Sequence, residues 1–234
     1  VGAWGVKLCL LNAAGAGLTL DVALREGFDA VSVQILQADK AHFYPAKTSM
    51  SLELVIDKKD RRVLGIQGIS PAGDALTARI NPVAALLSHK VDVDEISNLE
   101  VLYSPPFASA MDIVNALGNV ADNILSGRYK PMTLEAFDSA WMNREKEDFY
   151  LLDTRSRDMG AAFAEKFPHD WHNIPQDEIE ARLAEIPADK PVIITCSSGL
   201  RAYEAQLVLT HAGRDNTKAV LGGLTASARF GTTL

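Results

Sequence analysis

The stretch that decides the fold of the second half of the chain is Val192-Ile193-Ile194-Thr195-Cys196-Ser197-Ser198-Gly199-Leu200-Arg201-Ala202. Its first residues are wholly apolar, which is typical of a strand buried on both faces of a parallel sheet. Apolar residues between 205 and 212 then recur at helical spacing, so a helix follows the strand. Apolar runs at 149–153 and 219–221 continue this alternation of strands and helices. We therefore predict a small parallel α/β domain flanked by helices.

Cys196 leaves the C-terminal end of this strand just before the helix begins. The first N–H groups of a helix have no partner within it and form the positive end of its dipole, so a sulfur placed there is favoured as an anion. Gly199 permits a tight turn, and Arg201 adds a permanent positive charge at the rim. We predict that Cys196 is a nucleophile that can hold a second sulfur atom as a persulfide, stabilised by the loop amides.

Two chemistries use such a loop, namely hydrolysis of phosphate esters and transfer of sulfur. Four residues separate Cys196 from Arg201, one fewer than in the loops of cysteine phosphatases, and Thr195 stands where those enzymes place a histidine. A shorter loop suits a single sulfur atom better than a tetrahedral phosphate. Sulfur transfer is therefore the favoured interpretation, with phosphate-ester hydrolysis as an alternative.

Four motifs follow one another in the second half of the chain, which are Leu151-Leu152-Asp153-Thr154-Arg155, Asn173-Ile174-Pro175, Cys196-Ser197-Ser198-Gly199-Leu200-Arg201 and Leu221-Gly222-Gly223-Leu224. In these motifs and their order, roughly residues 132–234 resemble the rhodanese family. The resemblance implies that Cys196 is the sulfur-accepting nucleophile with Arg201 beside it. The substrate-binding residues are then Ser197, Ser198, Gly199 and Leu200, and the residues that organise the surrounding loops are Asp153 and Arg155. Residues 166–172 depart from the family's usual Gly-His-Ile-Pro-Gly-Ala stretch, which bears on substrate choice more than on fold.

The first half mixes strands and helices. Apolar runs predict strands at 6–11, 31–36, 52–56 and 63–69, the last two joined as a hairpin by the charged residues 57–62. Helical spacing predicts helices around 80–87 and 114–125, and Thr19 is expected to cap a short helix that ends at Gly27. The small residues 12–17 are expected to form a turn. Strands gathered ahead of helices predict an α+β domain on an antiparallel sheet.

Five stretches of the first half carry a second resemblance, namely residues 5–10, 41–45, 64–67, 103–107 and 111–123. In these stretches the first half is similar to the C-terminal dimerisation domain of the flavin-dependent pyridine nucleotide–disulfide oxidoreductases. The similarity implies a homodimer formed through residues 1–126, in which Tyr44 and Tyr103 reach the partner's redox cysteine and thiol substrate. A phenol beside a thiolate can donate a hydrogen bond or exchange a proton. The other interpretation of the two tyrosines is aromatic packing against neighbouring prolines.

Together the two resemblances indicate the C-terminal part of a coenzyme A-disulfide reductase–rhodanese fusion. We predict a dimerisation domain at 1–126, a linker at 127–132 and a rhodanese domain at 133–234. The resemblance implies a whole enzyme that uses FAD, NAD(P)H and coenzyme A to reduce persulfides, polysulfides or coenzyme A disulfides. No glycine-rich dinucleotide fingerprint opens a helix in this chain, so the nucleotide-binding domains are expected upstream of Val1. The rival interpretation is a non-catalytic dimerisation scaffold with a sulfur-binding or degenerate rhodanese module.

The amino-acid composition limits the kinds of partner and cellular setting that this chain is expected to have. With 30 acidic and 23 basic side chains in 234 residues the net charge is −7, which argues against nucleic acid as a partner. No apolar run approaches the roughly 20 residues of a membrane span. Two distant cysteines cannot form a disulfide framework, which indicates a reducing, cytoplasmic setting, and Cys9 is expected to be a small buried hydrophobe. His169 and His172 lack further ligands, so no metal is expected. The expected substrates are small sulfane-sulfur or thiol compounds.

Overall fold

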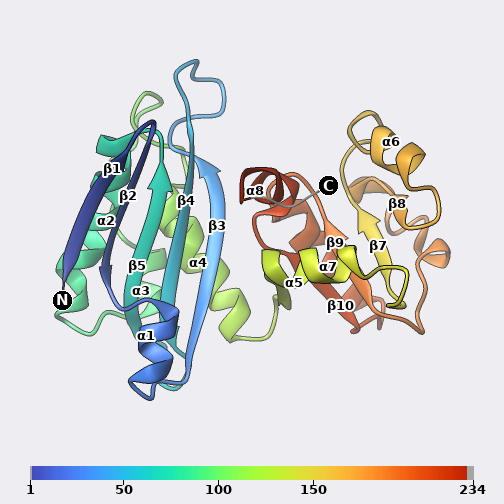
Figure 1. Ribbon diagram of the computed structural model, residues 1–234, viewed down its shortest axis with the longest axis horizontal. Helices are drawn as coiled ribbons and strands as arrows, with labels where there is room; N and C mark the ends of the chain where they lie inside the picture. The colour runs from blue at the N-terminus through green and yellow to red at the C-terminus, as the bar shows by residue number, and fades with distance from the viewer. Residues whose placement is uncertain (1, 231–234) are drawn as a thin grey trace. The chain divides into compact units, whose positions relative to one another are not determined.

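The computed structural model describes residues 2–230, and the chain divides between Ser126 and Gly127 into two compact units. Figure 1 labels the elements of both. The elements of the first unit are β1 (Ala3–Leu8), β2 (Leu11–Gly17), α1 (Leu20–Arg25), β3 (Ala30–Ala38), β4 (Ser49–Asp57), β5 (Val63–Ser70), α2 (Gly73–Leu87), α3 (Val93–Ser97) and α4 (Ile113–Leu125).

The first unit is built on one antiparallel sheet with the strand order β1-β2-β5-β4-β3. The predicted hairpin is present, because β4 and β5 pair on either side of the charged turn 57–62. Thr19 caps α1 through a hydrogen bond from the Val22 N–H, as its position before the helix predicts. The predicted antiparallel α+β fold is therefore confirmed for this unit.

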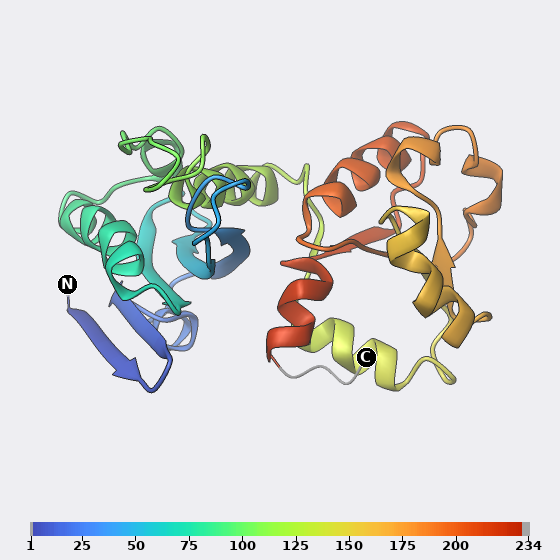
Figure 2. The same cartoon turned by 90° about the horizontal axis from the view of Figure 1, so that it is seen from above.

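Alternation along the strands decides which helix covers which face. Leu54 and Ile56 belong to the main apolar core with residues of α2, α3 and α4, while Val55 between them packs with the smaller cluster around α1. Since successive side chains of a strand point to opposite faces, α1 lies on the face opposite to α2 and α4. Figure 2 shows α2 and α4 together on one side of this sheet.

Three expectations near the N-terminus are wrong. The strand expected at 6–11 is interrupted by the turn of a hairpin, where Cys9 has a φ of 54° and is exposed rather than buried. Residues 12–17, expected as a turn, lie in strand β2, which pairs with β1 on one side and β5 on the other. Small side chains concealed this strand, because Ala14 and Ala16 are buried in the main core where larger residues would carry a stronger strand signal.

The second unit contains β6 (Pro131–Met132), α5 (Leu134–Met142), β7 (Tyr150–Asp153), α6 (Arg157–Lys166), β8 (Trp171–Asn173), two short 3-10 turns (Gln176–Glu178 and Leu183–Glu185), β9 (Val192–Thr195), α7 (Leu200–His211), β10 (Thr217–Val220) and α8 (Gly223–Phe230). Its strands form a parallel sheet in the order β6-β10-β9-β7-β8. In Figure 2, α7 lies on one face of this sheet and α5 and α8 on the other. The predicted parallel α/β fold is confirmed.

The segment 127–132, expected as a linker, is packed into the second unit. Pro131 and Met132 form the edge strand β6 beside β10, and Tyr129 just before it is only 4% exposed. Gln206 of α7 fixes Lys130 through both its backbone N–H and its carbonyl. Among residues 2–230, no helix is both long enough and apolar enough to cross a membrane.

Candidate active site at the Cys196 loop

The Cys196 loop connects the end of β9 to the start of α7, as the sequence predicts. Cys196 has no exposed surface, and the Gly199 N–H donates a hydrogen bond to its Sγ over 3.1 Å. Gly199 is also the N-cap of α7, so Sγ lies at the positive end of that helix. This arrangement suits a sulfur that carries negative charge.

Two glycines allow the loop to close around the sulfur. Gly199 has a φ of 98°, a conformation that a residue with a side chain rarely adopts. Gly223 has a φ of 57°, and a Cβ there would lie 2.4 Å from the carbonyl oxygen of Cys196. That close approach lets the N–H groups of Leu224 and Thr225, at the start of α8, bond to the carbonyls of Cys196 and Ser197. The Leu221–Leu224 motif therefore places the start of α8 in hydrogen-bond contact with the backbone of the cysteine loop.

The outer side of the loop is more open. Ser198 and Leu200 are exposed, and Arg201 donates a hydrogen bond from Nη2 to the Ser197 hydroxyl over 3.2 Å. Arg201 also lines a pocket of ≈ 580 Å³. Its other lining residues are Thr154, Ser156, Arg157, Pro175, Gln176, Asp177 and Glu178.

The charges around this pocket are unequally neutralised. Arg157 forms two hydrogen bonds with the Glu178 carboxylate, at 3.0 and 2.5 Å, which lowers the pKa of Glu178. No ion pair is found for Arg201 among the described residues. The positive charge nearest the cysteine loop is therefore available to an anionic ligand.

Asp153 and Arg155 form a buried pair at the end of β7. Arg155 donates to the Asp153 carboxylate from its backbone N–H, Nε and Nη2 at 3.0, 3.0 and 2.6 Å. The neighbouring Thr154 N–H bonds to the Thr195 carbonyl directly before Cys196. The structure thus brings this pair beside the base of the cysteine loop.

Trp171 completes this network and was not singled out from the sequence. Its indole N–H donates to Asp153 Oδ2 over 3.0 Å, and its ring packs with Trp141 and Phe163. Trp171 lies in the stretch that departs from the rhodanese motif, so the departure itself was the available signal. A large ring in this place serves as a hydrogen-bond donor to the buried carboxylate.

Tyr129 is a second residue that the sequence reading missed. It is buried, and its ring lies 5.0 Å from that of Tyr203 on α7. Burial raises the pKa of Tyr129, and negative charge at Cys196 raises it further, so the phenol keeps its proton. It could not be recognised from the sequence because it falls in the expected linker.

In the first unit the structure brings together the two segments that carry Tyr44 and Tyr103. The Ala41 N–H bonds to the Pro105 carbonyl over 3.3 Å, and the Ser109 hydroxyl bonds to the Lys40 carbonyl over 3.0 Å. Tyr44 is half-buried and Tyr103 is 51% exposed, so both are within reach of the surface.

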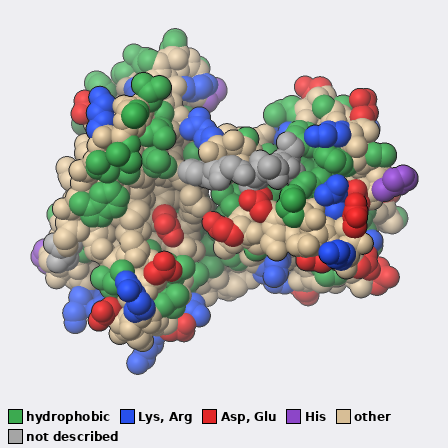
Figure 3. All heavy atoms as spheres, viewed as in Figure 1, with side chains coloured by type: hydrophobic (Ala, Val, Ile, Leu, Met, Phe, Trp, Pro, Cys, Tyr) green, Lys and Arg blue, Asp and Glu red, His purple; other side chains and the backbone are tan. Residues whose placement is uncertain are grey.

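The first unit carries two groups of exposed apolar side chains, apart from Leu24 on α1. One lies on the β1–β2 hairpin and contains Trp4, Val6, Leu8, Leu10 and Leu11; Figure 3 shows hydrophobic side chains gathered over these strands. The other lies on the two tyrosine segments and contains Phe43, Leu102, Tyr103, Phe107 and Met111. Apolar surface of this extent is typical of an interaction face. No cluster of three or more metal-ligating side chains occurs in residues 2–230.

The second unit is a parallel α/β domain with a buried cysteine at a helix N-terminus, the arrangement for which the sequence predicts sulfur transfer or phosphate-ester hydrolysis. The first unit is a mixed α+β domain with exposed apolar side chains. Comparison with protein families resolves both. Residues 5–114 match the dimerisation domain of the pyridine nucleotide-disulphide oxidoreductases, and residues 137–229 match the rhodanese-like domain. The chain therefore joins a domain of the first family to a domain of the second.

Several known proteins resemble this chain. A CoA-dependent NAD(P)H sulfur oxidoreductase of Pyrococcus furiosus is 30% identical over 114 residues, which are 49% of this chain and 25% of that protein. A coenzyme A disulfide reductase of Staphylococcus aureus is 28% identical over 39% of this chain and 20% of its own length. This chain thus matches about a quarter or less of these relatives.

Two solved structures resemble both units at once. An NAD-dependent persulfide reductase from A. fulgidus is 32% identical with a TM-score of 0.82, over 95% of this chain and 38% of that one. The reduced CoADR-RHD of Bacillus anthracis is 28% identical with a TM-score of 0.81, over 96% of this chain and 38% of that one. The predicted resemblance to reductase–rhodanese fusions is confirmed.

Proposed function

We propose that this chain is the C-terminal portion of an FAD- and NAD(P)H-dependent reductase of persulfides, polysulfides or coenzyme A disulfides, whose rhodanese domain carries sulfane sulfur on Cys196. The observation that carries the proposal is the hydrogen bond from the Gly199 N–H to Cys196 Sγ at the N-terminus of α7. The names of the similar proteins, which include a persulfide reductase and a coenzyme A disulfide reductase, support the same chemistry.

The loading step takes place at Sγ. The Cys196 thiolate attacks the sulfane sulfur of an anionic donor such as thiosulfate, a new S–S bond forms, and sulfite departs with the electron pair of the donor's broken S–S bond. The Arg201 charge favours approach of the donor anion, and the Gly199 N–H stabilises the sulfur that carries the negative charge. Because Sγ is fully buried, the exposed Ser198 and Leu200 side of the loop has to open for the donor to enter.

In the unloading step Cys196 changes from nucleophile to leaving group. A thiolate acceptor, for which we propose coenzyme A, attacks the outer sulfur of the persulfide, and the Cys196 thiolate leaves. The acceptor persulfide then needs two electrons and protons to give a thiol and sulfide. FAD and NAD(P)H, the cofactors that we propose for the longer enzyme, would supply those electrons.

The first unit has a role in the same scheme. We propose that it forms a homodimer through the exposed apolar side chains of the β1–β2 hairpin and of the two tyrosine segments. We also propose that Tyr44 and Tyr103 complete the partner's reductase site. Their phenols would hold or donate a proton at the departing sulfur. The proximity of the two segments supports a joint role, since the Ala41 N–H and the Pro105 carbonyl join them directly.

Transfer of sulfur from thiosulfate to cyanide by the 234-residue chain tests the proposal. We expect measurable turnover, its loss in Cys196→Ser, and its retention in Cys9→Ser, which removes the exposed cysteine of the β1–β2 turn instead. Equal rates for the wild type and Cys196→Ser would contradict the proposal and favour the non-catalytic scaffold. Turnover of p-nitrophenyl phosphate by the wild type would favour phosphatase chemistry.

A further inference from the structure

Arg79 is a charged residue in the interior of the first unit. It lies on α2, between Leu76 and Ile80 of the apolar core, and is only 6% exposed. A buried guanidinium is costly unless its donors are satisfied, so its partners indicate what it is for. It does not belong to the sulfur site described above.

The charge of Arg79 is balanced by Asp112, which is 3% exposed. Nη2 and Nε of Arg79 donate to Asp112 Oδ2 at 2.7 and 3.1 Å, a forked geometry that a lysine cannot reproduce. Asp112 is also the N-cap of α4, where its Oδ1 accepts from the Val114 N–H. The pair therefore ties α2 to the residue at which the second tyrosine segment ends.

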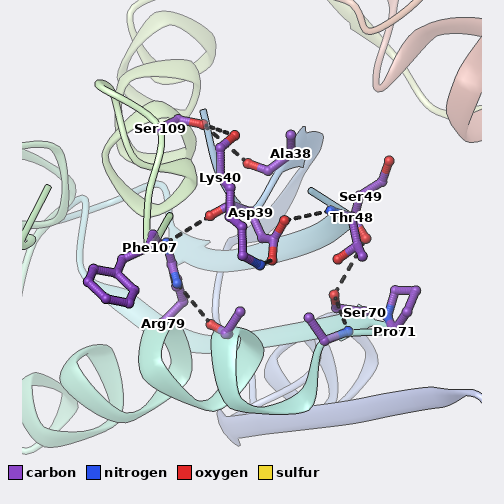
Figure 4. Close-up of polar contacts among 12 residues, drawn as sticks. Ala38, Asp39, Lys40, Thr48, Ser49, Ser70, Pro71, Arg79, Phe107 and Ser109 are labelled. Atoms are coloured by element: carbon purple, nitrogen blue, oxygen red, sulfur yellow. Dashed lines mark hydrogen bonds and ion pairs between the residues drawn. The ribbon is translucent and has the colours of Figure 1, made fainter. Parts of the chain in front are cut away.

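The same guanidinium holds the backbone of both tyrosine segments. Nη2 donates to the carbonyl of Phe107 over 2.9 Å and to that of Asp39 over 3.3 Å. Figure 4 shows Arg79 reaching from its helix to these two residues. Asp39 opens the segment that carries Tyr44, and Phe107 lies in the segment that carries Tyr103.

Neither segment is held by a regular sheet or helix at its tyrosine. Residues 39–48 and 99–112 consist of turns and irregular structure, joined to each other by a few bonds such as that from the Ser109 hydroxyl to the Lys40 carbonyl. Segments of this kind open locally at low cost unless a buried anchor holds them. Arg79 supplies such an anchor to both.

We propose that Arg79, held by Asp112, is a positioning residue that fixes the Tyr44 and Tyr103 segments relative to each other. The proposal rests on the proposed function in one respect, namely that the two tyrosines serve the reductase site. Its structural part stands without that assumption. The planar guanidinium matters as much as its charge, because Nε and Nη2 both donate to the Asp112 carboxylate, and the two N–H groups of Nη2 are shared between that carboxylate and the carbonyls of Phe107 and Asp39.

Hydrogen exchange of the 234-residue chain, resolved by segment, tests the structural part. Arg79→Lys keeps the charge opposite Asp112 but loses the fork, and Arg79→Gln/Asp112→Asn removes both charges while leaving an N-cap on α4. In both variants we expect exchange in 39–48 and 99–112 to accelerate by at least about tenfold, with β4 and β5 unchanged. The matched control is Arg61→Lys, since Arg61 pairs with Asp94 and Asp122 elsewhere in the same unit.

Unchanged exchange in the two segments, or an equal acceleration across β4 and β5, would overturn the proposal. Steady-state kinetics of the longer, flavin-containing protein test the link to function. We expect Arg79→Lys to lower kcat for persulfide reduction, and Arg79→Lys/Tyr103→Phe to lose less than the product of the two single effects. A kcat that falls in Tyr103→Phe but not in Arg79→Lys contradicts the positioning role. Absence of any reductase activity in the wild type contradicts the proposed function instead, while the exchange result still decides about Arg79.

Discussion

Replacing Asp153 by asparagine removes the charge from the most enclosed ion pair of the second unit. Asp153 has no exposed surface, and its carboxylate accepts from Arg155 and from the Trp171 indole. In Asp153→Asn one carboxylate oxygen becomes an NH₂ group. At the position of Oδ2 this group would face the Nη2 of Arg155 and the indole N–H of Trp171, which are both donors. The substitution also leaves the buried guanidinium of Arg155 without a counter-ion. Breaking a buried pair in this way costs about 3–5 kcal/mol. The matched variant Trp171→Phe keeps the ring and removes one donor, so we expect a loss of about 1–2 kcal/mol.

Urea unfolding followed by tryptophan fluorescence measures both losses. Trp141 and Trp171 are buried in the second unit, whereas Trp4 is 49% exposed in the first. Introducing Trp4→Phe into every variant makes the signal report on the second unit alone, although Trp171→Phe then retains only Trp141 as its reporter. A loss below about 1 kcal/mol in Asp153→Asn would refute the reasoning, because an uncompensated buried guanidinium cannot be that cheap.

Three further predictions concern the same unit. Gly223→Ala should lower the free energy of unfolding of this unit by about 1–3 kcal/mol, since a Cβ would lie 2.4 Å from the Cys196 carbonyl oxygen. Gly213→Ala also lies at positive φ, but a Cβ there would meet no atom within 4 Å, so its loss of free energy should be smaller. Urea unfolding compares the two variants, and equal losses would contradict the steric argument. Burial lowers the pKa of His172 below its ordinary value of 6.5, so the folded state favours the neutral imidazole. The contribution of His172 to the free energy of unfolding should be fully present above pH 6.5 and be lost as the pH falls through the lowered pKa of the folded state. Urea unfolding at several pH values should show a flatter pH profile for His172→Phe, and an unchanged slope would contradict this prediction. Arg201→Ala should slow sulfur transfer from thiosulfate to cyanide by about tenfold to a hundredfold. Arg157→Ala should slow it less, because Glu178 already neutralises the charge of Arg157. A larger effect of Arg157→Ala would contradict the conclusion that the Arg201 charge is the one available to an anionic donor.

Strong local signals made most of the fold predictable. The apolar run before Cys196 and the charged turn 57–62 each decide a local structure without help from distant residues, and both are found as predicted. The strand β2 was missed because its buried residues, Ala14 and Ala16, have low strand propensity. Their small side chains pack in the main core between the sheet and the helices. The edge strand β6 was missed because a two-residue strand carries no periodicity.

The candidate site was predictable where one continuous motif carries it. The cysteine loop is local, so Cys196, Gly199 and Arg201 could be read from adjacent residues. Trp171 and Arg79 could not, because each acts through a partner distant in sequence, Asp153 for the first and Asp112 for the second. An indole or a guanidinium has no recognisable pattern of its own until the fold shows what it faces.

The measurement that tests the central claim most directly is the mass of the Cys196 peptide after exposure to polysulfide. The chain has two cysteines, and Cys9 is exposed, so the Cys9→Ser variant makes Cys196 the one thiol that can take up sulfur. We predict a cyanide-removable gain of one sulfur atom on the peptide that contains Cys196, and no gain after Cys196→Ser in the same background. An unmodified Cys196 in a folded chain would contradict the claim that this residue carries sulfur.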